Sequence, residues 1–210
     1  MEYFIFILEI IGTVAFAISG ATVGIKKSMD LFGVCCLGLT TACAGGLFRD
    51  IILGKLPPTM FTKGVYALTA IGVSVTVFLF AFLKVKTQGK FFEIFHLIAD
   101  SLGLGIFTVV GMFASISAGH ENNFFFTVFL GLITGVGGGL LRDIMAEEPP
   151  YIFVKHVYAT AALIGACVCY GVNIFANDGI AMICGCGVIL LIRLLAAHFR
   201  WSLPKINKND

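Results

Sequence analysis

The chain contains one stretch twice, as Ala44-Gly45-Gly46-Leu47-Phe48-Arg49-Asp50-Ile51 and as Gly137-Gly138-Gly139-Leu140-Leu141-Arg142-Asp143-Ile144. Each copy lies near the end of a long apolar run and joins adjacent glycines to an adjacent Arg and Asp. Ionisable residues within apolar segments are expensive to bury and usually serve a function. A single copy is equally compatible with a charge pair at the membrane surface behind packing glycines. The duplication favours a functional site.

The composition predicts an all-α polytopic membrane protein. Of the 210 residues, 59% are hydrophobic and 12% are charged, about half the charge of a typical soluble domain. The net charge of +2 gives no reason to expect nucleic acid as a partner. Each membrane-spanning helix needs about 20 mostly apolar residues. Seven stretches qualify: 3–24, 31–53, 61–83, 97–118, 124–146, 152–175 and 179–199.

These spans form a single transmembrane domain over about 1–200, followed by a polar tail at 201–210. The repeat covers about 1–83 and 93–175, and the span at 179–199 has no counterpart. The matched residues keep offsets of 91 to 93: Glu9 with Asp100, Gly45 with Gly138, Pro57 with Pro149, Lys63 with Lys155 and Tyr66 with Tyr158. Three spans per copy is an odd number, so the copies insert in opposite orientations. Such inverted repeats usually form a substrate or permeation site at their interface.

The distribution of basic residues predicts the orientation. With the N-terminus outside, nine basic residues face the cytoplasm: Lys26, Lys27, Lys84, Lys86, Lys90, Lys155, Arg200, Lys205 and Lys208. Only Lys55 and Lys63 then face outward. Because positive residues concentrate on the cytoplasmic side, we expect the protein in the cell (inner) membrane with its N-terminus outside and its C-terminus inside.

The depth of the two Arg-Asp pairs depends on the glycines before them. From Leu31 to Arg49 is 18 residues, about 27 Å of unbroken helix, which would leave the pairs near opposite membrane surfaces. Glycine pairs can bend a helix sharply. Breaks there would move both pairs toward the centre, around a wet cavity where freed carbonyls hold permeant cations transiently. A central charge costs roughly 2.5–3.5 kcal/mol, so four of them require water or partners. The repetition favours the broken helices and the hydrated path.

Four further residues are secondary candidates because they recur in both copies: Glu9, Asp100, Lys63 and Lys155. On each first helix the acid, a Phe and a Gly lie at positions i, i+7 and i+11, which share one helical face. Glu9 is also compatible with an interfacial carboxylate. The two lysines follow the double prolines and either extend to the surface or line a pore mouth.

Other residues are expected to be structural. Arg193 is unrepeated, and we expect it to extend toward the cytoplasmic surface. Glycines on the first helix of each copy favour close helix packing; they are Gly12, Gly20, Gly103 and Gly111. The seven cysteines lie in apolar runs as small filler residues. No phosphate loop, metal-ligand set or nucleophile motif is present in the sequence, so we expect neither an enzyme nor a resident cofactor or metal.

Several motifs together resemble the prokaryotic TRIC family, relatives of the trimeric intracellular cation channels. They are the seven spans, the paired Gly-Gly-x-x-Arg-Asp and Pro-Pro pattern, Ser19-Gly20 and Asp30-Leu31-Phe32-Gly33. The resemblance implies a homotrimer in membrane lipid, with one pore per subunit that conducts potassium and sodium. It also implies that kinked second and fifth helices line the pore with Gly45, Gly46, Arg49, Asp50, Gly138, Gly139, Arg142 and Asp143.

The second copy departs from the first. It places Glu147-Glu148 where the first has Gly54-Lys55 and is one residue shorter before its prolines, which implies pore mouths of different charge. The Lys-Glu-Val signature of the animal relatives is absent from the sequence, so their lipid-headgroup site is not expected.

Two other functions remain open. Related bacterial sequences carry the name glycine transporter, so a secondary transporter of glycine or another small amino acid is the alternative. A passive membrane scaffold would explain the glycines but not the duplicated charges. The two Arg and two Asp residues nearly cancel, so the preference for cations follows from the resemblance alone.

The inverted repeat predicts opposite exposure for Lys26 and Glu121, which follow the first span of each copy. We expect Lys26→Cys to react with a membrane-impermeant maleimide only from the cytoplasmic side, and Glu121→Cys only from outside. The measurement is labelling of intact cells and inverted vesicles, in a background without the seven native cysteines. Labelling of both positions from one side would contradict the topology.

Overall fold

The computed structural model of the chain describes residues 2–83, 90–154 and 157–201. All the regular elements in these ranges are helices. Their bounds are α1 Glu2–Lys26, α2 Leu31–Ile52, α3 Thr59–Thr62, α4 Val65–Phe82, α5 Lys90–Ser115, η1 Ile116–His120, α6 Phe124–Met145, α7 Tyr151–Val154, α8 Ala159–Phe175 and α9 Asp178–His198. Six helices in the described ranges are long and apolar enough to cross a membrane. Helix α8 is apolar but has only 17 residues, about 26 Å.

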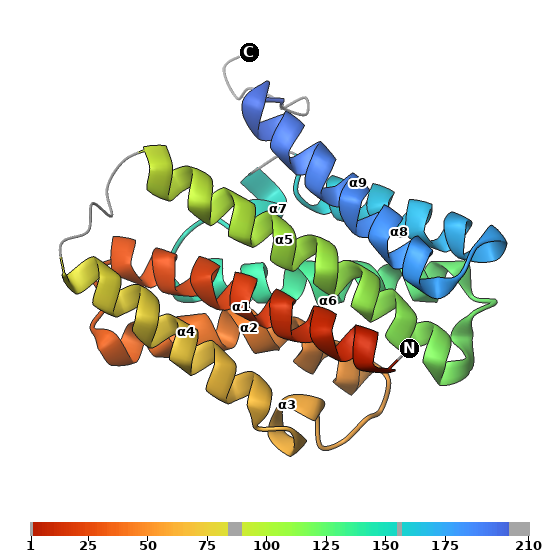
Figure 1. The fold of residues 1–210 in the computed structure, drawn as a ribbon, viewed down its shortest axis with the longest axis horizontal. Coiled ribbons are helices and arrows are strands. Elements are labelled where there is room, and N and C mark those ends of the chain that lie inside the picture. Colours follow the sequence, from red (N-terminus) through yellow and green to blue (C-terminus); the bar gives the residue numbers. More distant parts are fainter. Residues whose placement is uncertain (1, 84–89, 155–156, 202–210) are drawn as a thin grey trace, which may run out of the picture.

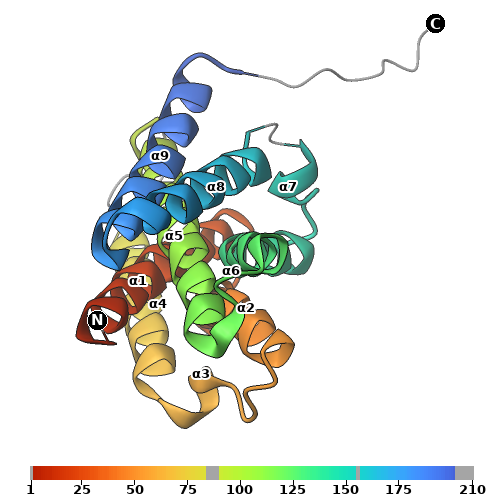
Figure 2. The ribbon, with the colours of Figure 1, turned by 90° about the vertical axis from the view of Figure 1, so that its right-hand side faces the viewer.

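The two repeats form one bundle in which equivalent helices run in opposite directions. In Figure 1, α1 runs from right to left and α5, its counterpart, from left to right. Helices α1, α2, α5 and α6 pack against one another at the centre, while α4 covers α1 and α2 and α8 covers α5 and α6. The short helices α3 and α7 lie on opposite sides of the bundle (Figures 1 and 2). The inverted repeat is therefore confirmed, with α9 added against α5 and α8.

Helices α2 and α6 pass through the glycine pairs without interruption. Every residue from Leu31 to Ile52 and from Phe124 to Met145 is α-helical. The unwound turns expected at Gly45-Gly46 and Gly138-Gly139 are therefore wrong, and no backbone carbonyl is freed there to hold a cation. The tertiary packing explains why these continuous helices contain the glycines.

One glycine of each pair lets α2 and α6 touch through their backbones. A Cβ atom on Gly45 would lie 2.0 Å from the carbonyl oxygen of Thr134, and one on Gly138 would lie 2.1 Å from that of Thr41. Thr41 and Thr134 are themselves equivalent positions of the repeat. The two contacts are thus equivalent, and the axis that relates the two repeats also relates one contact to the other. No residue other than glycine fits this crossing without displacing backbone.

The glycines of α1 and α5 have the expected packing role. A Cβ on Gly20 would lie 2.5 Å from the Thr41 hydroxyl, and one on Gly111 would lie 2.5 Å from the Thr134 hydroxyl. These contacts hold each first helix against the second helix of its own repeat, which confirms the packing interpretation.

The chain does break near the start of each third span, after the double prolines. The spans predicted at 61–83 and 152–175 are each divided into a four-residue helix and a longer one, α3 before α4 and α7 before α8. The predicted third spans are thus present as α4 and α8, each preceded by a short separate helix. Proline lacks the N–H that continues a helix and fixes its own φ, so each double proline precedes a short, separate helix.

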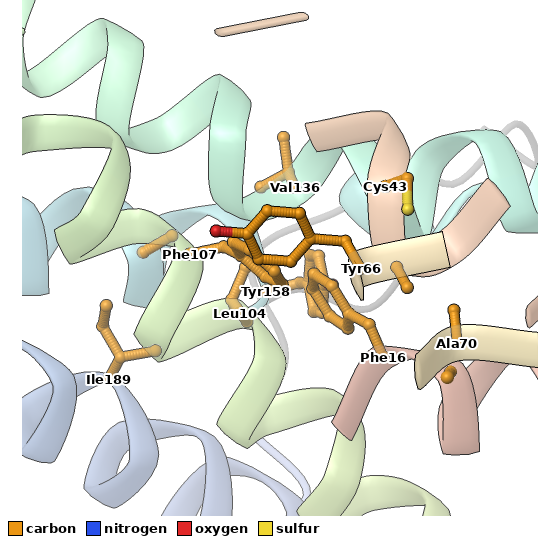
Figure 3. Packing of buried hydrophobic residues seen from close by; sticks show 12 residues of the cluster. Phe16, Cys43, Tyr66, Ala70, Leu104, Phe107, Val136, Tyr158 and Ile189 are labelled. Carbon is orange, nitrogen blue, oxygen red and sulfur yellow. The ribbon is translucent and has the colours of Figure 1, made fainter. Parts of the chain in front are cut away.

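An aromatic pair closes the middle of the bundle. Phe16 of α1 and Phe107 of α5 stack with ring centroids 5.4 Å apart and ring planes 16° apart. Both rings are buried among Leu104, Tyr66 and Tyr158, from both repeats (Figure 3). Gly103 and Gly12 make room for the two rings, since a Cβ on them would lie 2.2 Å from Phe16 and 2.9 Å from Phe107.

Adjacent glycines in α2 provide a matched test of the crossing. Gly45→Ala forces a Cβ into the Thr134 carbonyl, and overpacking of this kind costs about 1–3 kcal/mol. Gly46→Ala meets only the Arg49 guanidinium, at 3.9 Å, and gains helix propensity of about 1 kcal/mol. We expect a lower apparent Tm in detergent for Gly45→Ala and an equal or higher Tm for Gly46→Ala. Equal Tm values for the two variants would contradict the crossing contact.

Candidate functional site: two buried charge clusters

The first charge cluster consists of Glu9, Arg49, Asp50 and Tyr66, from α1, α2 and α4. The Arg49 guanidinium donates to Glu9 through Nη1 at 3.1 Å and to Asp50 through Nε at 2.9 Å. The Tyr66 hydroxyl donates to the second oxygen of Glu9. Arg49 is 7% exposed and Asp50 2%. The cluster therefore joins α1 and α2 through ion pairs and α4 through the Tyr66 hydrogen bond, and it carries a net charge of −1.

The second charge cluster repeats this arrangement on α5 and α6. Arg142 pairs with Asp100 through Nη1 at 2.5 Å and donates to Asp143 through Nε at 2.8 Å. The Ser19 hydroxyl of α1 donates to Asp100 at 3.1 Å. Asp100 and Arg142 are both 0% exposed. Helix α9 adds a fifth group, because Arg193 Nη2 lies 3.6 Å from Asp100 Oδ2. This cluster, defined as Asp100, Arg142, Asp143, Tyr158 and Arg193, is electrically neutral.

In each cluster the Asp after the Arg also fixes a short helix. The backbone N–H of Thr59, the first residue of α3, donates to Asp50 Oδ2 at 2.8 Å. The backbone N–H of Tyr151, the first residue of α7, donates to Asp143 Oδ2 at 2.8 Å. Both oxygens of these carboxylates are thus engaged, one by the Arg and one by the following helix.

Both Arg-Asp pairs lie in the last turn of a continuous helix, as the unbroken-helix alternative expected, and both are buried. Each Arg lies three residues before the end of its helix, which ends at Ile52 or Met145, so neither pair is drawn to the centre. Both pairs are nevertheless buried, because acids of α1 and α5 and the short helices α3 and α7 surround them. Burying a charge without a partner is very costly, and here every charge has an opposite charge in contact.

The family follows from comparison with known proteins. The family model described as "Glycine transporter" matches the chain over residues 6–81 and 97–173. A TRIC cation channel of known structure is 39% identical, with a TM-score of 0.83, 97% of this chain covered and 98% of that chain. The chain belongs to the prokaryotic TRIC family.

Two other relatives support the same family assignment. The trimeric intracellular cation channel orthologue from Rhodobacter sphaeroides is 30% identical, with a TM-score of 0.85, 94% of this chain covered and 98% of that chain. The UPF0126 inner membrane protein YadS of Escherichia coli (strain K12) is 35% identical over 201 residues, which are 94% of this chain and 93% of the relative.

In this TRIC family member, six of the predicted site residues meet in the clusters. They are Glu9, Arg49, Asp50, Asp100, Arg142 and Asp143. The glycines Gly46 and Gly139 adjoin them, since their nearest contacts include the guanidinium of Arg49 and of Arg142. Lys63 is exposed and apart from the first cluster, and Lys155 lies outside the described residues.

The main difference from the sequence-based expectations is the position of the Arg193 side chain. It was expected to extend to the surface, but it is 4% exposed, with its guanidinium carbon 4.8 Å from the Tyr158 ring centroid. Tyr66 and Tyr158 were also absent from the predicted site. Their signal was present in the sequence, because they occupy equivalent positions of the repeat. Arg193 gave no such signal, because α9 has no counterpart.

Each cluster borders a cavity. The second cluster lies at a vestibule of about 610 Å³, bordered by α5 and α9 and lined by Asp100 and Arg193 with Lys26, Glu93 and Arg200. The first cluster borders a cavity of only about 30 Å³, whose lining includes Phe107. The loop glutamate Glu148 lies 3.2 Å from Lys27. The arrangement offers carboxylates to a cation at opposite ends of the bundle, separated by the stacked phenylalanines.

Proposed function

We propose that this protein is a channel for monovalent cations, potassium and sodium, in the inner membrane. The observation that carries the proposal is the 39% identity to a TRIC cation channel over 97% of the chain. The two clusters support it, because each contributes two carboxylates to the interface between inverted repeats, where transport sites usually form. The N-out, C-in orientation is supported by the basic residues, and the inner membrane by the Escherichia coli relative.

The proposed path runs from the vestibule past Asp100, along Phe16 and Phe107, to Glu9. Asp100 and Phe107 lie on one face of α5, and Glu9 and Phe16 on the equivalent face of α1. Glu9 and Asp100 are the carboxylates next to this path, and Asp50 and Asp143, which also hold α3 and α7, add their negative charge beside it. With ring centroids 5.4 Å apart, the two phenylalanines must separate before a hydrated cation passes.

A second candidate function is secondary transport of glycine or another small amino acid. The name of the matching family model favours it. A carrier moves its substrate by conformational cycles and gives no resolved unitary currents. Planar-bilayer recording from purified protein therefore separates the two functions.

The acids beside the arginines provide the functional test. In bilayers with KCl on both sides, we expect the parent to show unitary currents and Asp50→Asn or Asp143→Asn to reduce them by about fivefold. That factor corresponds to about 1 kcal/mol, the energy of two unit charges 4 Å apart in water. Glu121→Gln removes the same charge from an exposed loop and serves as the control. Unitary currents equal to the parent in both Asn variants would exclude these clusters from the path, and absent parent currents would exclude the channel.

We also propose that the protein assembles as a homotrimer, as the family relatives named trimeric do. Glycine faces are common at helix contacts in membranes, and many apolar side chains on the bundle surface are exposed, including Phe32 at 77%. Light scattering of the detergent-solubilised protein, corrected for detergent, should give about three times 22.5 kDa. A stable monomer in mild detergents would contradict the trimer.

A further inference from the structure

The second cluster contains one charged group that the first lacks, and this group comes from α9. In the first cluster the Tyr66 hydroxyl donates to Glu9. In the second, the equivalent Tyr158 hydroxyl is buried without a hydrogen-bond partner among the described residues. Arg193 lies over the Tyr158 ring and faces Asp100 instead. Helix α9 has thus placed a positive charge where the first repeat has none.

The Arg193–Asp100 contact is loose compared with its neighbour. Arg142 approaches Asp100 Oδ1 to 2.5 Å, whereas Arg193 Nη2 stays 3.6 Å from Asp100 Oδ2. Within the described residues, neither Asp100 Oδ2 nor Arg193 Nε has a hydrogen-bond partner, although both side chains are at least nine-tenths buried. Buried polar atoms are nearly always hydrogen-bonded. Asp100 Oδ2 and the Arg193 guanidinium therefore lie at ion-pair distance at the wall of the vestibule, without a hydrogen bond between them.

Space is available for Arg193 to leave this position. Arg193, Ala196 and Ala197 line the vestibule from one face of α9, at positions i, i+3 and i+4, and Arg200 lines it from just beyond the end of this helix at His198. The two alanines leave the vestibule open alongside the arginine. A long, flexible side chain there can extend toward Arg200 at the exposed end of the helix.

We propose that Asp100 Oδ2 is a cation-binding position at the deep end of the vestibule, and that Arg193 occupies it as a tethered competitor of the permeant cation. With Arg193 in place, the second cluster is neutral. With Arg193 withdrawn, the second cluster carries a net charge of −1, the same as the first cluster, and the Arg193 guanidinium no longer lies against Asp100 Oδ2. A monovalent cation then replaces the guanidinium. Arg193 thereby sets how easily cations enter from the vestibule side. This part of the proposal rests on the proposed channel function.

The test removes this charge and compares it with a matched charge in the same vestibule. In bilayers at low KCl, Arg193→Gln should raise the unitary conductance by about fivefold, the factor expected for removing one unit charge about 4 Å away. Arg200→Gln makes the same charge change at an exposed position, and its conductance should stay within about twofold of the parent. If both variants behave alike, general vestibule charge is responsible and the tethered-competitor proposal is wrong.

A binding measurement tests the same position without conduction. At matched ionic strength, KCl instead of choline chloride should raise the apparent Tm of Arg193→Gln by roughly 3 °C or more, because K⁺ binds the vacated carboxylate in the folded state. The parent and Arg200→Gln should show no such difference. Absence of a potassium-specific shift in Arg193→Gln would overturn the proposal, even if the parent conducts.

A second variant and the binding measurement distinguish a failure to fold, and a failure of the channel function, from a failure of this proposal. If Arg193→Gln fails to assemble, Arg193→Met keeps an aliphatic stem over Tyr158 and is judged by the same criteria. If the parent carries no cation current, the channel function fails, while the potassium-specific Tm shift still decides whether Asp100 binds a cation once Arg193 is removed.

Discussion

The fold depends on the backbone contact between α2 and α6. Gly45 and Gly138 bring each helix against the threonine carbonyl of the other, and this close approach sets the axis about which the two repeats are related. Because the helices remain continuous, Arg49 and Arg142 are carried to opposite ends of the bundle. The positions of both charge clusters therefore follow from a contact that contains no charge.

The clusters in turn tie the helices together through ion pairs and hydrogen bonds. Each arginine bonds an acid on the first helix of its repeat and the aspartate that follows it, and that aspartate holds the next short helix. Removing one partner would leave a buried charge uncompensated, which is strongly destabilising. Asp50 and Asp143 therefore have two structural roles, because each pairs with its arginine and also holds a short helix, α3 or α7.

Helix α9 makes the two halves unequal. Without it, each repeat would present two carboxylates and one arginine, and the two charge clusters would have the same net charge. Arg193 neutralises the second cluster, and the vestibule of about 610 Å³ beside it has no equal at the first cluster, whose cavity is about 30 Å³. Helix α9, which lies outside the repeat, thus makes the charge and the cavity at one cluster different from those at the other.

The sequence alone determined the helical class, the inverted repeat and six charged site residues, because apolar run length and repeated residues require no knowledge of packing. It did not determine what the glycine pairs do. A glycine permits a bend or a close contact equally well, and only the Thr134 carbonyl facing Gly45 and the Thr41 carbonyl facing Gly138 decided for contact. Nor did it place Arg193, because whether an arginine near a helix end reaches the surface or an internal carboxylate depends on the neighbouring helix. Here α9 packs on α5, and this packing places the Arg193 guanidinium beside Asp100.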